Sequence, residues 1–104
     1  PEVGLVSDGP AAVAPVPSDY RLGQNYPNPF NPSTSITFEL PTGTEVRLEV
    51  FNIGGERVAL PVNGYRSAGT HTVVWHAGSY PSGVYFYRLL AGSFNATGRM
   101  LLLK

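Results

Sequence analysis

From residue 20 onward, the chain is dominated by short segments in which apolar and polar residues alternate. In residues 35–40 every second side chain is apolar, and residues 45–51 show the same pattern. Successive side chains of a β-strand point to opposite faces, so a period of two is typical of strands with one buried face in an antiparallel sheet. We therefore predict a strand in each range, with a turn between them at residues 41–43.

Further apolar segments, separated by turn signals, predict the other strands. They lie at residues 56–60, 70–76, 84–90 and 94–103, with a loop at 77–83 and a turn at 91–93. The 84–90 segment is rich in aromatic and β-branched residues, so we expect a central strand buried on both faces. Asn63 and Gly64 both tolerate positive φ, which predicts a hairpin turn. Pro61 cannot donate a ladder hydrogen bond and therefore marks a sheet edge or a strand end.

The number and spacing of these strands predict the fold class. About seven strands with turn signals roughly every ten residues are typical of an all-β, antiparallel β-sandwich of immunoglobulin-like or fibronectin-like form. A small barrel is the alternative. Trp75 lies in the middle of a predicted strand, so we place it in the core with Val73, Tyr85 and Tyr87.

The first 19 residues differ in composition from the rest of the chain. They hold four Pro, three Ala and four Val, show no periodicity, and carry a net charge of −3, whereas residues 20–104 carry +3. We interpret residues 1–19 as an extended linker and residues 20–104 as one domain. Because the chain begins with Pro1 and ends in an apolar run followed by Lys104, we expect the C-terminal piece of a longer protein.

Composition and charge argue against several function classes. The 104 residues contain no Cys, which excludes disulfides, thiolate zinc sites and Cys nucleophiles. Seven basic residues balance seven acidic ones, so the chain has neither a basic footprint for nucleic acid nor an attraction to an anionic membrane. No segment approaches the run of about 18 apolar residues that a membrane span requires.

The residues that could carry chemistry do not form a catalytic or metal-binding pattern. His71 and His76 are five positions apart in one predicted strand, so they point to opposite faces and make a poor metal pair. No serine lies in a Gly-x-Ser-x-Gly elbow. We predict no enzyme activity, no cofactor and no metal site. The glutamates that alternate with apolar neighbours are predicted to be solvated, namely Glu39, Glu45, Glu49 and Glu56.

A group of aromatic residues, Tyr80, Tyr85, Phe86 and Tyr87, allows another interpretation. If all were exposed on one flat face, they would form a platform on which a sugar could stack. Three of them are consecutive in a predicted strand and therefore alternate between its faces, which favours core packing. The alternative function is an accessory module that binds carbohydrate or protein.

Residues 25–32, with the sequence Asn-Tyr-Pro-Asn-Pro-Phe-Asn-Pro, are the most unusual part of the chain. Three prolines fix φ and favour extended geometry at the residues before them. The asparagine side chains can cap local backbone groups. We predict a stiff connection between the first and second strands, anchored by Tyr26 and Phe30.

This segment carries a resemblance to a known family. Residues 22–34 resemble the opening motif of the type A C-terminal sorting domains of the type IX secretion system, which end secreted and surface proteins of the Bacteroidetes and related bacteria. Residues 50–58, 68–75 and 82–89 continue the likeness in order, and the class overlaps the immunoglobulin-like domain of flagellar hook-capping proteins. The residues that match the family's motifs are Pro27, Asn28, Pro29, Phe30, Asn31, Pro32, Gly54, Gly55, Gly69, Trp75, Gly83, Tyr85 and Lys104.

Two positions depart from the family's pattern. His76 stands where the family often has Asp, and Gly98-Arg99 stands where it often has two basic residues. The first departure affects a turn interaction, and the second weakens the basic signal near the C-terminus.

The resemblance implies a non-catalytic address on an upstream cargo protein. The domain would fold as a monomer in the periplasm of a Gram-negative bacterium and be read by the outer-membrane secretion machinery. A sortase-like peptidase would then cut in the linker, leaving the cargo secreted or on the cell surface. A last strand ending at Lys104 could present its edge to a receptor. A structural immunoglobulin-like spacer remains an alternative.

Overall fold

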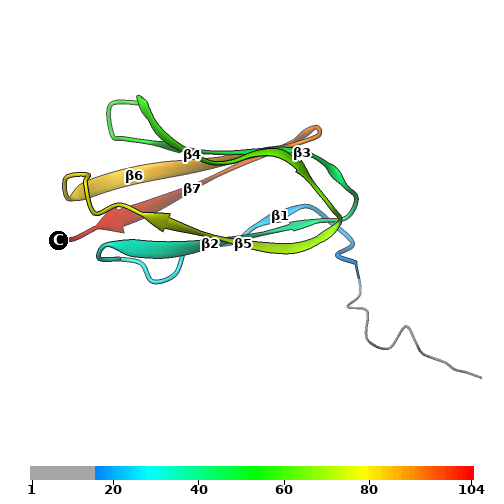
Figure 1. Ribbon diagram of the computed structural model, residues 1–104, viewed down its shortest axis with the longest axis horizontal. Helices are drawn as coiled ribbons and strands as arrows, with labels where there is room; N and C mark the ends of the chain where they lie inside the picture. Colours follow the sequence, from blue (N-terminus) through cyan, green and yellow to red (C-terminus); the bar gives the residue numbers. More distant parts are fainter. Residues whose placement is uncertain (1–15) are drawn as a thin grey trace, which may run out of the picture.

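A computed structural model describes residues 16–104, which form seven strands in two antiparallel sheets. The two sheets face each other as the layers of a sandwich (Figure 1). One sheet has the order β1-β2-β5 and the other β4-β3-β6-β7. This arrangement confirms the predicted all-β sandwich. The strands are β1 (Arg21–Leu22), β2 (Ser33–Leu40), β3 (Thr44–Phe51), β4 (Arg57–Arg66), β5 (Gly69–His76), β6 (Gly83–Ala91) and β7 (Phe94–Leu102).

Most of the linker predicted at residues 1–19 lies outside the described residues, which begin at Val16. Residues 16–20 contain neither helix nor strand and lead directly into β1. The division between linker and domain remains a prediction. Residues 16–104 contain no helix long and apolar enough to cross a membrane.

The core forms where the alternating pattern predicts it. Along β2 every second side chain is fully buried, and Val46, Leu48 and Val50 of β3 are buried in the same way. Trp75 is buried as predicted, and Val73 is partly buried against the core. Each large apolar side chain buried here stabilises the fold by roughly 1.5–3 kcal/mol.

The burial of β6 differs from the prediction. Tyr85, Tyr87, Leu89 and Ala91 are buried between the sheets, but the alternate residues of the strand are only half-buried. The strand is central, because β3 and β7 pair on either side of it. Its outer face nevertheless has no covering layer among residues 16–104, so the prediction of burial on both faces is wrong.

The predicted hairpin turn at Asn63-Gly64 is also wrong, because β4 continues through both residues to Arg66. Its pairing with β3 extends from Phe51↔Arg57 to Thr44↔Arg66 and overrides the local turn signal. Gly64 does take positive φ, but it does so inside the strand. Pro61 lies in an edge strand beside an irregularity in the pairing register, as its missing N–H favours.

Glu49 was predicted to be solvated, but its side chain is only 4% exposed. It lies on the outer face of β3, where long arginine side chains from neighbouring positions close over it. Its carboxylate pairs with Arg88 at 2.8 Å, Arg57 at 3.1 Å and Arg47 at 3.5 Å. Burial alone would raise the pKa of Glu49, but hydrogen bonds from Arg88 and Arg57 outweigh it and hold the pKa below its usual value. Glu45 and Glu56 are exposed, as predicted.

Tyr87 links the two layers through its buried hydroxyl. The hydroxyl donates to the carbonyl oxygen of Gly23 at 2.8 Å and accepts from the backbone N–H of Asn25 at 3.0 Å. Its ring lies over Gly98, the opposite residue on β7, where an added Cβ would clash with the ring. Gly98 therefore gives Tyr87 the space to reach the chain that precedes β2.

We expect Glu49→Gln to lower the free energy of unfolding by about 1–3 kcal/mol near neutral pH, because it removes charge-assisted hydrogen bonds. A carboxyl whose pKa is lowered on folding stabilises the protein above its ordinary pKa, and this contribution is lost as the pH falls through the folded-state value. The difference between wild type and variant should therefore shrink in acid. Chemical denaturation across this pH range measures it.

Glu45→Gln is the matched control, since Glu45 is an exposed glutamate on the same strand. Equal and small effects of the two substitutions at neutral pH would contradict the stabilising role of the Glu49 cluster.

Candidate recognition site

The segment before β2 forms backbone hydrogen bonds with the end of β7. Phe30 N–H donates to the Leu101 carbonyl at 3.0 Å, and Leu103 N–H donates to the Phe30 carbonyl at 3.0 Å. The two bonds create a short parallel bridge between Phe30 and Leu102. In Figure 1 the end of β7 runs from the layer of its own sheet toward the other layer. We call this contact, between residues 28–30 and 101–103, the terminal pairing.

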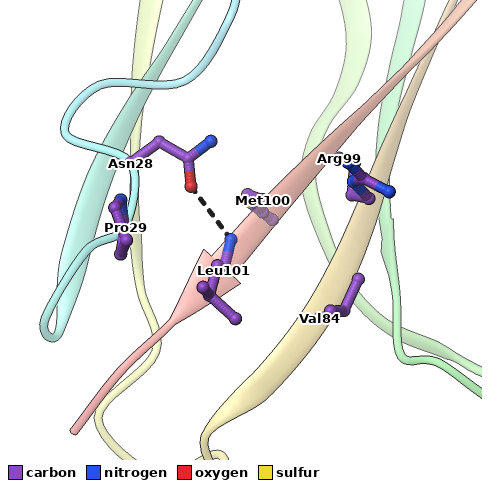
Figure 2. A pocket seen from close by; sticks show the side chains of 6 residues that line it. All are labelled: Asn28, Pro29, Val84, Arg99, Met100 and Leu101. Atoms are coloured by element: carbon purple, nitrogen blue, oxygen red, sulfur yellow. Dashed lines mark hydrogen bonds between the residues drawn. The ribbon is translucent and has the colours of Figure 1, made fainter.

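Asn28 extends the terminal pairing through its side chain. Its Oδ1 accepts the backbone N–H of Leu101 at 3.0 Å, as Figure 2 shows. Asn28 was predicted to cap local backbone, but it caps a strand 73 positions away. A pocket of about 330 Å3 opens beside this bond. Its lining comes from the segment, from β6 and from β7, namely Asn28, Pro29, Val84, Arg99, Met100 and Leu101.

A buried polar cluster fixes the start of the segment. Asn25 and Thr34 are each only 2% exposed. Asn25 Nδ2 donates to Thr34 Oγ1 at 3.0 Å and to the Pro27 carbonyl at 3.2 Å. Thr34 Oγ1 donates to the same carbonyl at 2.9 Å. Every buried polar group named here has a hydrogen-bond partner, so the cluster holds one conformation at little desolvation cost.

Only one of the two predicted anchors is buried. Phe30 packs into the core against Trp75, with ring centroids 5.9 Å apart. Tyr26 is 79% exposed, so its prediction as an anchor is wrong. The backbone of Tyr26 exchanges two hydrogen bonds with Ser35 of β2, at 2.8 and 2.9 Å, which places the residue at a sheet edge. Its ring therefore faces solvent.

Lys104 ties the chain end to the loop between β5 and β6. Its Nζ donates to the carbonyls of Gly78 and Tyr80, both at 2.8 Å. Its backbone N–H donates to Ser82 Oγ at 2.9 Å. In the same loop, the Pro81 carbonyl accepts a hydrogen bond from the Tyr85 hydroxyl at 2.7 Å. The chain end and the loop are thus held together beside the core.

The pairing registers place most of the predicted motif at one end of the sandwich. Gly83↔Leu102 and Phe51↔Phe86 bring the start of β6, the end of β7 and the β3–β4 turn to that end. Ser33↔His76 brings the start of β2 and the end of β5 there as well. Gly69 pairs with Leu40 at the opposite end, so it alone lies apart. The residues at the shared end are Pro27, Asn28, Pro29, Phe30, Asn31, Pro32, Gly54, Gly55, Trp75, Gly83, Tyr85 and Lys104.

The glycine turn between β3 and β4 is built by one asparagine. Asn52 Oδ1 accepts the N–H groups of Gly54 and Glu56, both at 3.0 Å. Gly55 has φ of 88°, a left-handed conformation that a side chain would strain. Gly54 and Gly55 therefore shape a turn.

Sequence reasoning missed the buried partners of the motif. Thr34 and Tyr87 hold the segment in place but were not assigned to it, whereas Asn25, predicted to cap local backbone, does donate to the nearby Pro27 carbonyl. Thr34 offered a signal, because it shares the inward face of β2 with three apolar residues. A polar residue at such a position requires a buried hydrogen-bond partner.

The histidines and aromatics lie on different faces of their strands. His71 stacks on Phe38 with ring centroids 5.3 Å apart, whereas His76 Nδ1 contacts Ser33 Oγ at 2.8 Å on the outer face. Residues 16–104 contain no group of three metal-ligating side chains. Tyr85 and Tyr87 are buried, as predicted for core packing, so they cannot join Phe86 in a flat platform.

The terminal pairing lies within the residues that a known family model matches. The family model for the secretion system C-terminal sorting domain matches residues 24–103. The chain belongs to this family. The match begins just before the buried cluster and ends at the last residue of the terminal pairing. It confirms the resemblance to type IX sorting domains. A comparison with curated proteins finds no match.

Membership in the sorting-domain family gives a functional context for the end of the sandwich that holds the terminal pairing. A type IX sorting signal acts at the C-terminal end of an exported protein. In this chain the end of β7 is joined to the proline-rich segment that precedes β2. The two parts form one surface only when the chain is folded.

We expect Asn28→Ala to increase amide hydrogen exchange at Leu101 by about fivefold, because it removes an acceptor whose bond contributes on the order of 1 kcal/mol. Hydrogen exchange followed residue by residue by NMR measures this. Asn31→Ala is the matched control, since Asn31 is exposed and accepts no hydrogen bond among residues 16–104. Equal protection of Leu101 in both variants would contradict the bond.

Proposed function

We propose that the domain is a non-catalytic sorting signal that directs an upstream cargo protein across the bacterial outer membrane. The family match supports a role in type IX secretion. The terminal pairing is the observation that carries the finer proposal, because it joins both ends of the family's motif in one folded surface. The secretion machinery would then recognise a folded shape.

The proposed recognition surface is the end of the sandwich that holds the terminal pairing and Lys104. Both ammonium contacts of Lys104 go to backbone carbonyls of the β5–β6 loop. Lys104 would therefore act by ordering this end. The carbonyls do not neutralise its ammonium charge, and the residue is exposed. This role fits a basic residue that follows an apolar strand in the family's pattern.

Processing in the linker fits the position of the chain before β1. Arg21 pairs with Glu39 near the end of β2, so residues 16–20 approach the sandwich from the end opposite the terminal pairing. A sortase-like peptidase could cut there while the machinery holds the other end. We propose that the domain folds as a monomer in the periplasm and that its cargo becomes secreted or surface-bound.

Lys104→Ala in a reporter fused to residues 1–104 should reduce export, because it removes both bonds from the ammonium group to the β5–β6 loop. Arg66→Ala is the matched control, since Arg66 is a basic residue at the opposite end of the sandwich. The reporter is measured in the periplasm and in the medium of a host with a type IX system. We expect at least about a fivefold loss for Lys104→Ala alone, equivalent to roughly 1 kcal/mol of recognition.

Retention of the wild-type fusion in the periplasm would overturn the proposed function. Equal export of the two variants would leave a sorting role intact but place recognition elsewhere on the domain.

A further inference from the structure

Among residues 16–104, three of the four sheet edges carry at least one feature that hinders pairing with another chain. The terminal pairing covers the C-terminal part of β7. β4 contains Pro61 and register irregularities, and the Tyr80 hydroxyl donates to its Val58 carbonyl at 2.8 Å. β1 is only two residues long. Such features are the usual means by which proteins prevent edge-to-edge association.

The fourth edge, β5, has none of these protections. The strand pairs with β2 over eight residues without a register shift, from Ser33↔His76 to Leu40↔Gly69. It contains neither Pro nor any Lys, Arg, Asp or Glu. Val74, in the outward-facing row of the strand, is 49% exposed. An edge of this kind is a ready template for another strand.

The hydrogen bonds of β2 show which groups of β5 face the open edge. Ala77 N–H donates to the Pro32 carbonyl. In an antiparallel pair the N–H and C=O groups of successive residues point to opposite sides, so those of every second residue, counted backward from Ala77, point toward β2. Ser35 lies opposite Val74, and its N–H and C=O groups point away from β5 and bond to Tyr26. The N–H and C=O groups without a backbone partner among residues 16–104 therefore belong to Thr70, Thr72, Val74 and His76.

We propose that this edge accepts an extended strand from a component of the secretion machinery, which adds to the sheet beside β5. The inference rests on the proposed function, which requires such a component to recognise the domain. Unpaired donors and acceptors that repeat every second residue match only an extended backbone. The sequence had suggested the edge of the last strand instead, but the chain's own Phe30 already pairs with the end of that edge.

The side chains along β5 define the chemistry of the incoming strand. Its outer row would lie beside Thr70, Thr72 and Val74, which are uncharged. Its inner row would lie beside Val73, which is partly buried against the core. The partner strand is therefore uncharged, with β-branched or aliphatic residues at alternate positions and no Pro at the central positions.

Val74→Pro tests the proposal because the N–H of Val74 points to the open edge. The substitution removes a donor from that edge and leaves the hydrogen bonds to β2 in place. Val74→Thr is the control that keeps the N–H. Each full chain is fused to the reporter, and export is measured in the type IX host, with folding of the purified chains checked by thermal unfolding. We expect Val74→Pro to lower export by about tenfold and Val74→Thr to leave it unchanged.

A second pair of variants covers the case in which Val74→Pro does not fold. Thr72→Lys places a charge on the open edge, and Thr37→Lys places the same charge one strand inward. Both remove the same hydrogen bond between the two threonine hydroxyls, which are 3.0 Å apart. Only Thr72→Lys should reduce export.

The outcomes separate the proposals. Export of the folded edge variants at the wild-type level overturns strand addition and leaves the sorting function standing. Failure of the wild-type fusion overturns both. Sedimentation of the purified chain tests a second copy as the occupant, and a dimer that Val74→Pro dissociates would overturn the assignment to the secretion machinery.

Discussion

Two backbone hydrogen bonds on Phe30 join the two sheets at one end of the sandwich. The segment that carries Phe30 continues into β2 of the three-stranded sheet, whereas Leu101 and Leu103 belong to the end of β7 and the residue after it. The bonds also place the Phe30 ring against Trp75 in the core. Asn28 accepts the N–H of Leu101 beside this contact, and Lys104 bonds to the β5–β6 loop just after it. The terminal pairing therefore organises the end of the molecule that we propose is recognised.

This constraint explains why the family's motif is spread along the chain. Asn28 and Leu101 are 73 positions apart, but they share one hydrogen bond. A short peptide containing only the last strand would lack its partner segment, and the opening motif alone would lack the strand. Under the proposed function, a folded signal of this kind would also report that the domain has reached its native state. Recognition through backbone geometry at β5 would extend the same principle to the edge of the smaller sheet.

Local alternation predicted the strands well, because one buried face imposes a period of two on β2 and β3 whatever their neighbours. The failures depend on groups distant in sequence. Asn63-Gly64 is a strong turn signal, yet the long pairing with β3 holds both residues in a strand. The sequence pattern around Glu49 predicts a solvated residue, but in the fold arginines from adjacent strands cover it.

The candidate site was only partly predictable for the same reason. The unusual composition of residues 25–32 identified the segment, and Phe30 was correctly placed as an anchor. Its contact with β7 could not be derived, because no local pattern states which strand edge a proline-rich segment will cover. Tyr26 and Phe30 look equivalent in sequence, but only the fold shows that Tyr26 pairs at an edge with its ring in solvent.

The central claim is that sorting depends on the terminal pairing. Export of the reporter fused to Leu103→Pro, compared with Leu103→Ala, tests this claim most directly. The Leu103 side chain is half exposed, and its N–H donates to the Phe30 carbonyl, so only the proline variant removes the bond. We predict that Leu103→Pro stays in the periplasm and that Leu103→Ala is exported. Equal export of the two folded variants would contradict the account.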